Sequence, residues 1–156
     1  MVKRWSGSQK GGGVMFIGEY QHTLDAKGRM FMPSKFREEL GDSFIVTLGL
    51  DNCLFAFPAD EFDKLKLKLD SLPISNKDAR QFARFFFAGA CECETDKQGR
   101  IMIPAKLRSY AKLEKEVTVV GVSTRLELWN TQKWEEEHSF DNFSPDMLSE
   151  KLEGLL

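Results

Sequence analysis

Short apolar runs separated by turn-forming residues predict β-strands in the first part of the chain. Glu19–Leu24 has strand propensity, Asp25–Gly28 has the composition of a tight turn, and Arg29–Met32 is a short apolar run. Pro33 follows directly and ends the second run, since proline cannot donate to a strand ladder. We therefore predict a β-hairpin over Glu19–Met32.

A short helix and a second pair of strands are predicted next. Ser34–Leu40 carries two apolar residues four positions apart, and Gly41 follows as a helix stop. Phe44–Leu48 and Leu54–Phe57 are apolar runs on either side of a turn-forming segment. This part of the chain therefore combines strands with a short helix.

Two longer helices are predicted in the middle of the chain. Ala59–Ser71 has an apolar stripe at helical spacing and ends before Pro73, and Asn76 is placed to cap a second helix that runs to Ala88. Three phenylalanines of that helix share one face, and a fourth lies elsewhere: Phe82, Phe85, Phe86 and Phe87. Two interpretations stay open for this aromatic group, a buried core helix or a contact between subunits.

An acidic tail ends the chain. Residues 135–156 contain seven acidic residues and a single base, Lys151. A last helix is predicted over Pro145–Leu155, after a flexible-looking segment, Ser139–Ser144. The tail could be a spacer, a packing helix, or a brake that competes with an anionic ligand for basic residues.

One phrase of the sequence occurs twice. Asp25–Arg37 recurs as Asp96–Arg108 at a constant offset of 71 residues, with six of 13 positions identical. The similarity continues with a one-residue slip, so that Gly49–Phe57 matches Gly121–Trp129. Two copies are too few for a solenoid, and the repeat therefore indicates a fused pair of similar half-domains.

Composition narrows the class of protein. The chain has 156 residues, 42% of them hydrophobic and 29% charged, and lacks an apolar run long enough to span a membrane. Its three cysteines, Cys53, Cys91 and Cys93, fit no zinc spacing and favour a reducing cytoplasm. His22 and His138 lie in no catalytic or metal-binding pattern, and no glycine-rich phosphate loop follows residue 14. We therefore expect that the protein is not an enzyme and that it binds no metal, no cofactor and no small-molecule substrate.

The first fourteen residues do not read as part of the fold. Lys10–Met15 is what an in-frame ribosome-binding site followed by a start codon could encode. One hypothesis is therefore that Met15 is the true start, and the rival is that residues 1–14 are the remnant of an expression tag.

The repeated phrase is basic although the whole chain has a net charge of −2. Each copy carries four basic residues against one aspartate, which predicts an anionic partner such as nucleic acid, bound by local patches. The basic residues are Lys27, Arg29, Lys35 and Arg37 in the first copy and Lys97, Arg100, Lys106 and Arg108 in the second.

Arg29 and Arg100 are the best candidates to contact DNA. A guanidinium directly after a tight turn can reach a phosphate or make a bidentate contact with guanine. Gly28 and Gly99 supply the positive φ of the turn. Asp25 and Asp96 either orient the arginine four residues later or only pin the hairpin, and both roles stay open. The remaining lysines and outer arginines would neutralise phosphates, although Arg37 and Arg108 could instead pair with neighbouring acids.

These residues resemble a known family. The opening phrase Met15–Tyr20, followed by two Asp-x-x-Gly-Arg phrases that each run into Pro-x-Lys-x-Arg, is similar to the MraZ family of bacterial transcription factors. The match covers roughly 15–138. That family is built from two AbrB/SpoVT-type β-hairpin halves.

The resemblance implies an α+β fold, mainly β, in which two AbrB-like hairpin and short-helix halves form a pseudo-two-fold, β-barrel-like core. It also implies a homo-oligomeric ring in the cytoplasm, associated with the nucleoid, that binds direct repeats in double-stranded DNA upstream of the division and cell-wall gene cluster. The alternative is an AbrB-like oligomerisation module that recruits a protein partner without reading DNA. The expected segments are the leader 1–14, half one at 15–61, a helical connection at 62–89, half two at 90–134 and the acidic tail 135–156.

Overall fold

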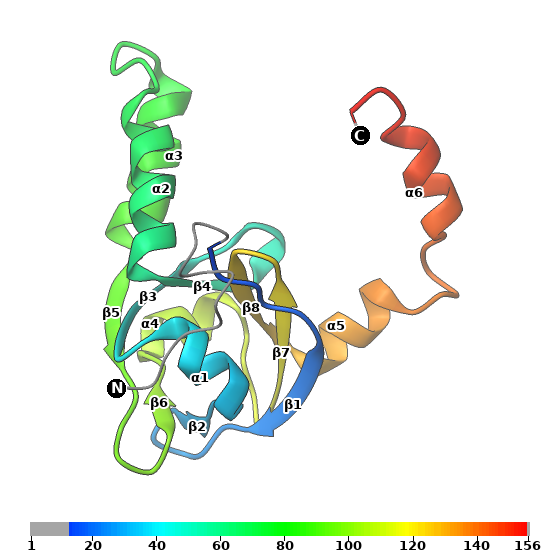
Figure 1. The fold of residues 1–156 in the computed structure, drawn as a ribbon. Helices are drawn as coiled ribbons and strands as arrows, with labels where there is room; N and C mark the ends of the chain where they lie inside the picture. The colour runs from blue at the N-terminus through cyan, green and yellow to red at the C-terminus, as the bar shows by residue number, and fades with distance from the viewer. Residues whose placement is uncertain (1–12, 156) are drawn as a thin grey trace.

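A computed structural model describes residues 13–155 of the chain as a mixed α+β fold (Figure 1). The first half contains, in chain order, β1 (Glu19–Thr23), β2 (Arg29–Phe31), α1 (Ser34–Leu40), β3 (Ser43–Leu48), the 3-10 helix η2 (Leu50–Asn52), β4 (Leu54–Pro58), α2 (Ala59–Asp70) and α3 (Lys77–Ala88). The second half contains β5 (Cys91–Glu94), β6 (Arg100–Met102), α4 (Ala105–Tyr110), β7 (Glu116–Val122), β8 (Arg125–Asn130), α5 (Thr131–His138) and α6 (Pro145–Lys151). The predicted α+β class is confirmed.

The larger of two sheets has six antiparallel strands in the order β1-β7-β8-β4-β3-β5. Strands at the same distance from the two edges of the sheet are equivalent in the sequence repeat. These pairs are β1 and β5 at the edges, then β7 and β3, then β8 and β4 at the centre. A pseudo-two-fold axis therefore passes between β4 and β8, where Phe55 lies opposite Glu127. The predicted fold of two similar halves is confirmed.

The second sheet consists of β2 and β6 alone. Met30 lies opposite Ile101 at the centre of this antiparallel ribbon, and both side chains are only 1% exposed. Two equivalent backbone bonds extend the pairing, from Met32 N–H to Gly99 O (3.1 Å) and from Ile103 N–H to Gly28 O (2.8 Å). The ribbon therefore lies on the same pseudo-two-fold axis as the large sheet.

The predicted hairpin over Glu19–Met32 is wrong in its strand pairing. The turn itself forms, because Gly28 N–H donates to Asp25 O (3.0 Å) and Asp25 N–H donates to Arg29 O (2.8 Å). Beyond the turn, however, β1 pairs with β7 and β2 pairs with β6, both from the other half. The two halves carry nearly the same phrase, so local sequence cannot distinguish pairing within a half from pairing between halves.

Two apolar clusters lie in the described part of the chain. One is built around Phe16, Phe36 and Phe44 and contains the buried residues of β2 and β6. The other contains Phe55 and Trp129 on the central strands. It is packed against side chains of α2, α3 and α5. The second cluster therefore attaches the helices that follow β4 and β8 to the sheet.

The predicted start of α3 is confirmed, since the side chain of Asn76 accepts a hydrogen bond from Ala79 N–H (3.0 Å). The last helix ends at Lys151, not at Leu155, and further turns follow it. The structure also contains α5, which was not predicted as a helix. Its signal was Asn130, whose side chain caps the helix by accepting from Lys133 N–H (3.0 Å).

The assignment of residues 1–14 to a leader needs one correction at its end. Val14 is buried in the main core, and Phe16 makes two backbone hydrogen bonds with Ser123 (2.8 and 2.9 Å) that hold this segment against β7. Residues 1–12 of the leader, with the rest of that prediction, lie outside the described residues.

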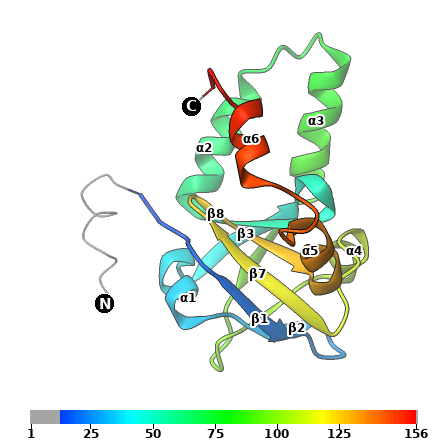
Figure 2. The ribbon, with the colours of Figure 1, turned by 90° about the vertical axis from the view of Figure 1, so that its right-hand side faces the viewer.

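The ribbon β2–β6 and the helix pair α2–α3 lie at opposite ends of the molecule. Figures 1 and 2 show α2 and α3 projecting from one end, with the turns that precede β2 and β6 at the other. Effects at the two ends can therefore be tested separately.

Within 13–155, no helix has the length and apolar character needed to cross a membrane.

Candidate nucleic-acid interface

The outer face of the β2–β6 ribbon presents two arginines and two apolar side chains. Side chains alternate between the two faces of a strand, so the buried Met30 and Ile101 leave their neighbours pointing outward. Arg29 lies opposite Met102, and Phe31 lies opposite Arg100. Phe31 is 53% exposed and Met102 is 56% exposed. The pseudo-two-fold axis therefore relates the arginines to each other and the apolar residues to each other.

Asp25 organises the turn that carries Arg29. Its Oδ1 accepts from the backbone N–H groups of Lys27 and Arg29, both at 2.9 Å, and its Oδ2 accepts from Arg29 Nε at 2.8 Å. One carboxylate thus closes the turn and fixes the direction of the guanidinium.

Asp96 does the same in the second half. Its Oδ1 accepts from the N–H groups of Gln98 (2.9 Å) and Arg100 (2.8 Å), and its Oδ2 accepts from Arg100 Nε (2.9 Å). The two turns are thus repeated bond for bond, and in each of them the aspartate both closes the turn and bonds the arginine four residues later.

Both carboxylates are stabilised in their charged form. The backbone N–H of Arg29 is the main cause that lowers the pKa of Asp25, helped by the Arg29 guanidinium and the N–H of Lys27. The equivalent groups of Arg100 and Gln98 lower the pKa of Asp96. Because each aspartate contacts only Nε, the terminal amino groups of both arginines have no hydrogen-bond partner among residues 13–155. Those groups remain available to a ligand.

Gly28 and Gly99 are required by conformation and by close contact with the other half. Each has φ +84°, a region that side chains with a Cβ rarely adopt. A Cβ on Gly28 would lie 2.8 Å from the guanidinium carbon of Arg108 and 2.9 Å from the carbonyl oxygen of Ile103. A Cβ on Gly99 would lie 2.8 Å from Nη1 of Arg37. Each turn therefore packs under an arginine from the opposite half.

Arg37 and Arg108 make hydrogen bonds within the chain. The Nε of each donates to a backbone carbonyl oxygen and not to a neighbouring acid. Arg37 Nε donates to Met32 O (3.1 Å) and Arg108 Nε donates to Ile103 O (2.9 Å). Both side chains are half-buried and reach the turn of the other half. Arg37 and Arg108 therefore help to join the two halves, and the phosphate contact predicted for them stays a prediction.

The four predicted lysines are all exposed. Lys27 and Lys97 lie in the two turns, while Lys35 and Lys106 lie in the first turns of α1 and α4. The Nζ of Lys35 also lies 5.6 Å from the ring centre of Tyr20. Each lysine therefore lies within six residues of Arg29 or Arg100 along the chain.

The four phenylalanines of α3 are not brought to this interface. Phe86 is buried in the second cluster, Phe85 packs on Tyr110 (ring centres 6.0 Å apart) and Phe87 packs on Phe62 (6.1 Å). Phe82 is 40% exposed. The helix thus contributes to the core of its own chain, and Phe82 is the member with the largest surface left for a subunit contact.

Sequence reasoning missed Phe31 and Met102. Both occupy the same position of the repeated phrase, directly after the buried central residue of each strand. The alternation of buried and exposed positions in β2 and β6 was the available signal. Their exposure beside two oriented arginines makes them part of the candidate interface.

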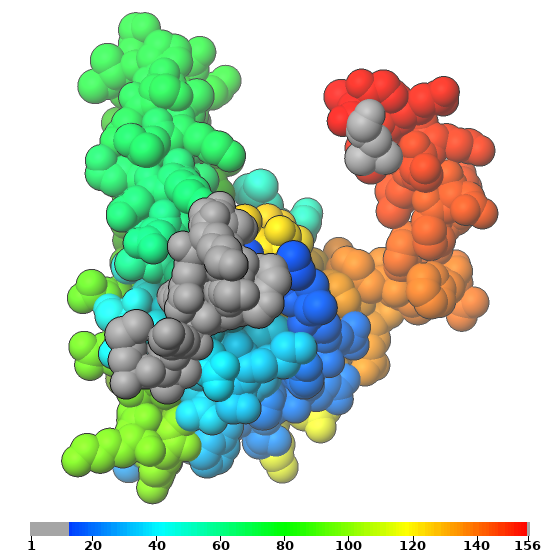
Figure 3. All heavy atoms as spheres, viewed as in Figure 1, coloured from blue at the N-terminus to red at the C-terminus, as the bar shows by residue number. Residues whose placement is uncertain are grey.

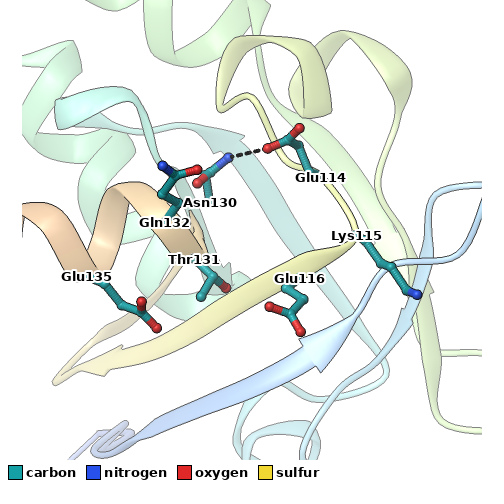
Figure 4. A pocket seen from close by; sticks show the side chains of 7 residues that line it. All are labelled: Glu114, Lys115, Glu116, Asn130, Thr131, Gln132 and Glu135. Carbon is teal, nitrogen blue, oxygen red and sulfur yellow. Dashed lines mark hydrogen bonds between the residues drawn. The ribbon is translucent and has the colours of Figure 1, made fainter.

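A recess of about 490 Å³ near the start of β7 has a different character (Figure 4). It is lined by Glu114, Glu116 and Glu135 with one lysine, and Glu114 is bonded to Asn130 (3.4 Å). Its negative charge opposes phosphate binding. Within 13–155 no group of three acidic, histidine or cysteine side chains could hold a metal ion.

Comparison with known proteins identifies the family. The model of the family described as "MraZ protein, putative antitoxin-like" matches twice, at 15–85 and 86–147. The chain belongs to the MraZ family. The resemblance drawn from the doubled phrase is thereby confirmed, and the two matches follow the two halves of the pseudo-symmetric fold.

Relatives in the MraZ family match over nearly their full length. The protein of Acetivibrio thermocellus is 59% identical over 138 residues, which covers 88% of this chain and 96% of the relative. That of Caldicellulosiruptor saccharolyticus is 56% identical and that of Alkaliphilus metalliredigens 57%, each over 90% of this chain and 99% of the relative. All three are named transcriptional regulator MraZ. This is the name of a non-enzymatic family, in agreement with the expectation that the protein is not an enzyme.

Proposed function

We propose that this protein is a transcriptional regulator that binds double-stranded promoter DNA through the outer face of the β2–β6 ribbon. The carrying observation is the pair of arginines, Arg29 and Arg100, each held by an aspartate at Nε while its terminal amino groups stay available. The names of the relatives support the same class of function.

The shape of the interface fits the major groove of B-DNA. That groove is about 12 Å wide and admits a two-stranded β-ribbon. Arginines on the outer face of such a ribbon can make bidentate bonds with guanine O6 and N7, and apolar side chains beside them can contact thymine methyl groups. Arg29 and Arg100 fill the first role, and Phe31 and Met102 fill the second.

The surrounding charges set the strength of binding. Lys27, Lys35, Lys97 and Lys106 neutralise phosphates, which contributes affinity without base preference and makes binding weaken as salt rises. Arg37 and Arg108 add charge while holding the two turns in place. Phosphate contacts therefore position the ribbon, and the four central side chains select bases.

A ring of subunits on direct repeats completes the proposal. One three-residue ribbon contacts few bases, so a single subunit binds weakly. Several ribbons on repeats spaced by about 10 bp lie on one face of the DNA and gain avidity from their high effective concentration. The resemblance to the MraZ family supports repeats upstream of the division and cell-wall gene cluster as the target, and we propose a cytoplasmic, nucleoid-associated location accordingly.

The test is binding of purified protein to the duplex upstream of its own gene, compared with a scrambled duplex, by fluorescence anisotropy across a salt series. The double variant Arg29→Ala/Arg100→Ala should lose preference for the native duplex. The matched control is Lys77→Ala/Arg84→Ala, which removes the same charge from the exposed surface of α3 and should keep it. Size-exclusion chromatography checks that both variants assemble like the unmodified chain.

Two results would contradict this function. Equal, weak binding of the unmodified protein to both duplexes would show that the basic patches do not read sequence, which would favour the alternative of a partner-recruiting module. Equal losses in the arginine variant and the α3 control would show that only total charge matters.

A further inference from the structure

A groove of about 580 Å³ lies between the α2–α3 helix pair and the β7–β8 turn. Phe55, Phe57 and Phe86 are its buried apolar residues, while Leu50 and Phe82 are large exposed residues of the lining. Exposed apolar surface of this kind is typical of an interaction site. The groove lies at the end of the molecule opposite the β2–β6 ribbon, and the proposed DNA contact does not use it.

The groove is basic around its apolar floor. Lys64, Lys68 and Arg125 line it, against the single acid Glu61. Glu61 pairs with Lys64 (3.0 Å) and Arg125 pairs with Glu127 (2.7 Å), whereas Lys68 has no ion-pair partner among the described residues. An occupant with apolar and acidic side chains is therefore complementary to it.

Helix α6 of the same chain has that chemistry. Its apolar residues Met147 and Leu148, with Leu152 just after the helix, are all exposed. Three acids lie among them: Asp146, Glu150 and Glu153. Figures 1 and 3 show α6 apart from α2 and α3, with open space between them. Among residues 13–155, neither the groove nor the helix therefore has a partner that covers its apolar surface.

The segment before α6 is held against α5 and directs α6 away from its own groove. The Asn142 side chain donates to the Glu136 carbonyl, and Phe143 N–H donates to Ser139 O (3.2 Å). The Phe143 ring contacts that of His138 (6.2 Å), and His138 stacks on Trp134 (3.8 Å). Because these contacts anchor the segment, α6 does not lie in the groove of its own chain.

We propose that α6 of one subunit docks in the groove between α2–α3 and the β7–β8 turn of the next subunit. The contact joins two different surfaces, so it is head-to-tail, and such contacts close into rings when the rotation between subunits permits. The proposal rests on the homo-oligomer of the proposed function and names the surfaces that build it. Apolar burial supplies the attraction, and Lys68 attracts the acids of α6.

Photo-crosslinking of the full chain is the direct test. A benzophenone amino acid at position 148 should give a covalent dimer whose crosslink maps by mass spectrometry to groove residues such as Phe82 or Leu50. Crosslinks to the groove of the same chain, crosslinks elsewhere, or no dimer would overturn the proposal. Because α6 lies apart from the core, this change leaves the fold of the chain intact.

Light scattering coupled to chromatography tests the energetics. The variant Leu148→Asp/Leu152→Asp should shift the mass from a multiple of 17.8 kDa to a single chain, whereas Leu67→Asp, at a more exposed position of α2 outside the groove lining, should not. Lys68→Glu should weaken assembly more than Lys66→Glu, which lies on the same helix outside the groove.

The outcomes separate this inference from the proposed function. If the unmodified chain assembles and the α6 variant assembles equally well, the docking of α6 is overturned while the ring stands. If the unmodified chain is itself a 17.8 kDa monomer, both the ring and the docking fall. DNA binding by that monomer would still support the role of Arg29 and Arg100.

Discussion

The two halves of the chain agree closely at one end of the molecule and differ at the other. At the β2–β6 end, each turn has the same aspartate bonds, the same positive-φ glycine and the same arginine from the opposite half. At the other end, β4 is followed by the long pair α2 and α3, whereas β8 is followed by the short helices α5 and α6. The two halves are therefore most similar at the β2–β6 ribbon, where they meet on the pseudo-two-fold axis.

This difference indicates two kinds of surface. A face on a two-fold axis is built from equal contributions, so a change in one half should have the same effect as its counterpart in the other. The proposed head-to-tail contact joins two unlike surfaces, and the helices that form them, α6 and the pair α2–α3, lie in the segments that differ between the halves. We therefore expect paired effects at the ribbon and unpaired effects at the helices.

The largest expected effects come from the centre of the ribbon. Met30→Ala and Ile101→Ala should each lower the free energy of unfolding by about 2–5 kcal/mol, and by similar amounts, because each empties a buried site on the same axis. Urea denaturation measures both. The outward neighbours Phe31→Ala and Met102→Ala are the controls and should stay within about 0.5 kcal/mol. A large loss in only one central variant would break the symmetry argument.

The glycines should show a smaller loss with a defined order. Gly28→Ala and Gly99→Ala both place a Cβ at positive φ, which costs on the order of 1–3 kcal/mol. Gly28→Ala should be the worse, because its Cβ also meets the backbone oxygen of Ile103 at 2.9 Å, whereas at Gly99 the three atoms nearest to the Cβ all belong to the Arg37 side chain. Thermal denaturation of the two variants side by side gives the order, and a reversed order would contradict these contacts.

The smallest effect concerns the two aspartates and pH. Their pKa values are lowered in the folded chain, so the stability they contribute is present above the unfolded pKa of about 4. It is lost as pH falls from there through the lowered folded pKa. Asp25→Asn/Asp96→Asn should therefore melt at a lower temperature than the unmodified chain at pH 7, and the difference should shrink below about pH 4. A difference independent of pH would show that the charge of these groups is not involved.

Most elements of each half, though not α5, could be predicted from the sequence, but not the way the halves combine. The Asn76 cap and the helix Ser34–Leu40 depend on neighbouring residues, and both were found. The partner of β2 depends on which of two similar strands lies near it in space, and there the local prediction failed. The pairing of β2 is set by packing between the two halves, because the two candidate partner strands have similar local sequences.

The candidate interface shows the same limit. Arg29 and Arg100 could be identified because the phrase repeats, and so could the aspartates that orient them. Phe31 and Met102 could be recognised only once β2 and β6 lay side by side with Met30 and Ile101 buried beneath. The groove joins residues from Leu50 to Arg125, which no local pattern connects.

The most direct measurement compares Arg29→Ala with Arg100→Ala as single variants on the native upstream duplex, at one salt concentration, by fluorescence anisotropy. If both arginines read DNA from one pseudo-symmetric face, each variant should lose about 1–3 kcal/mol of binding free energy, and the two losses should be similar. Unchanged affinity in both variants, or a loss confined to one of them, would contradict a DNA interface built equally from the two halves.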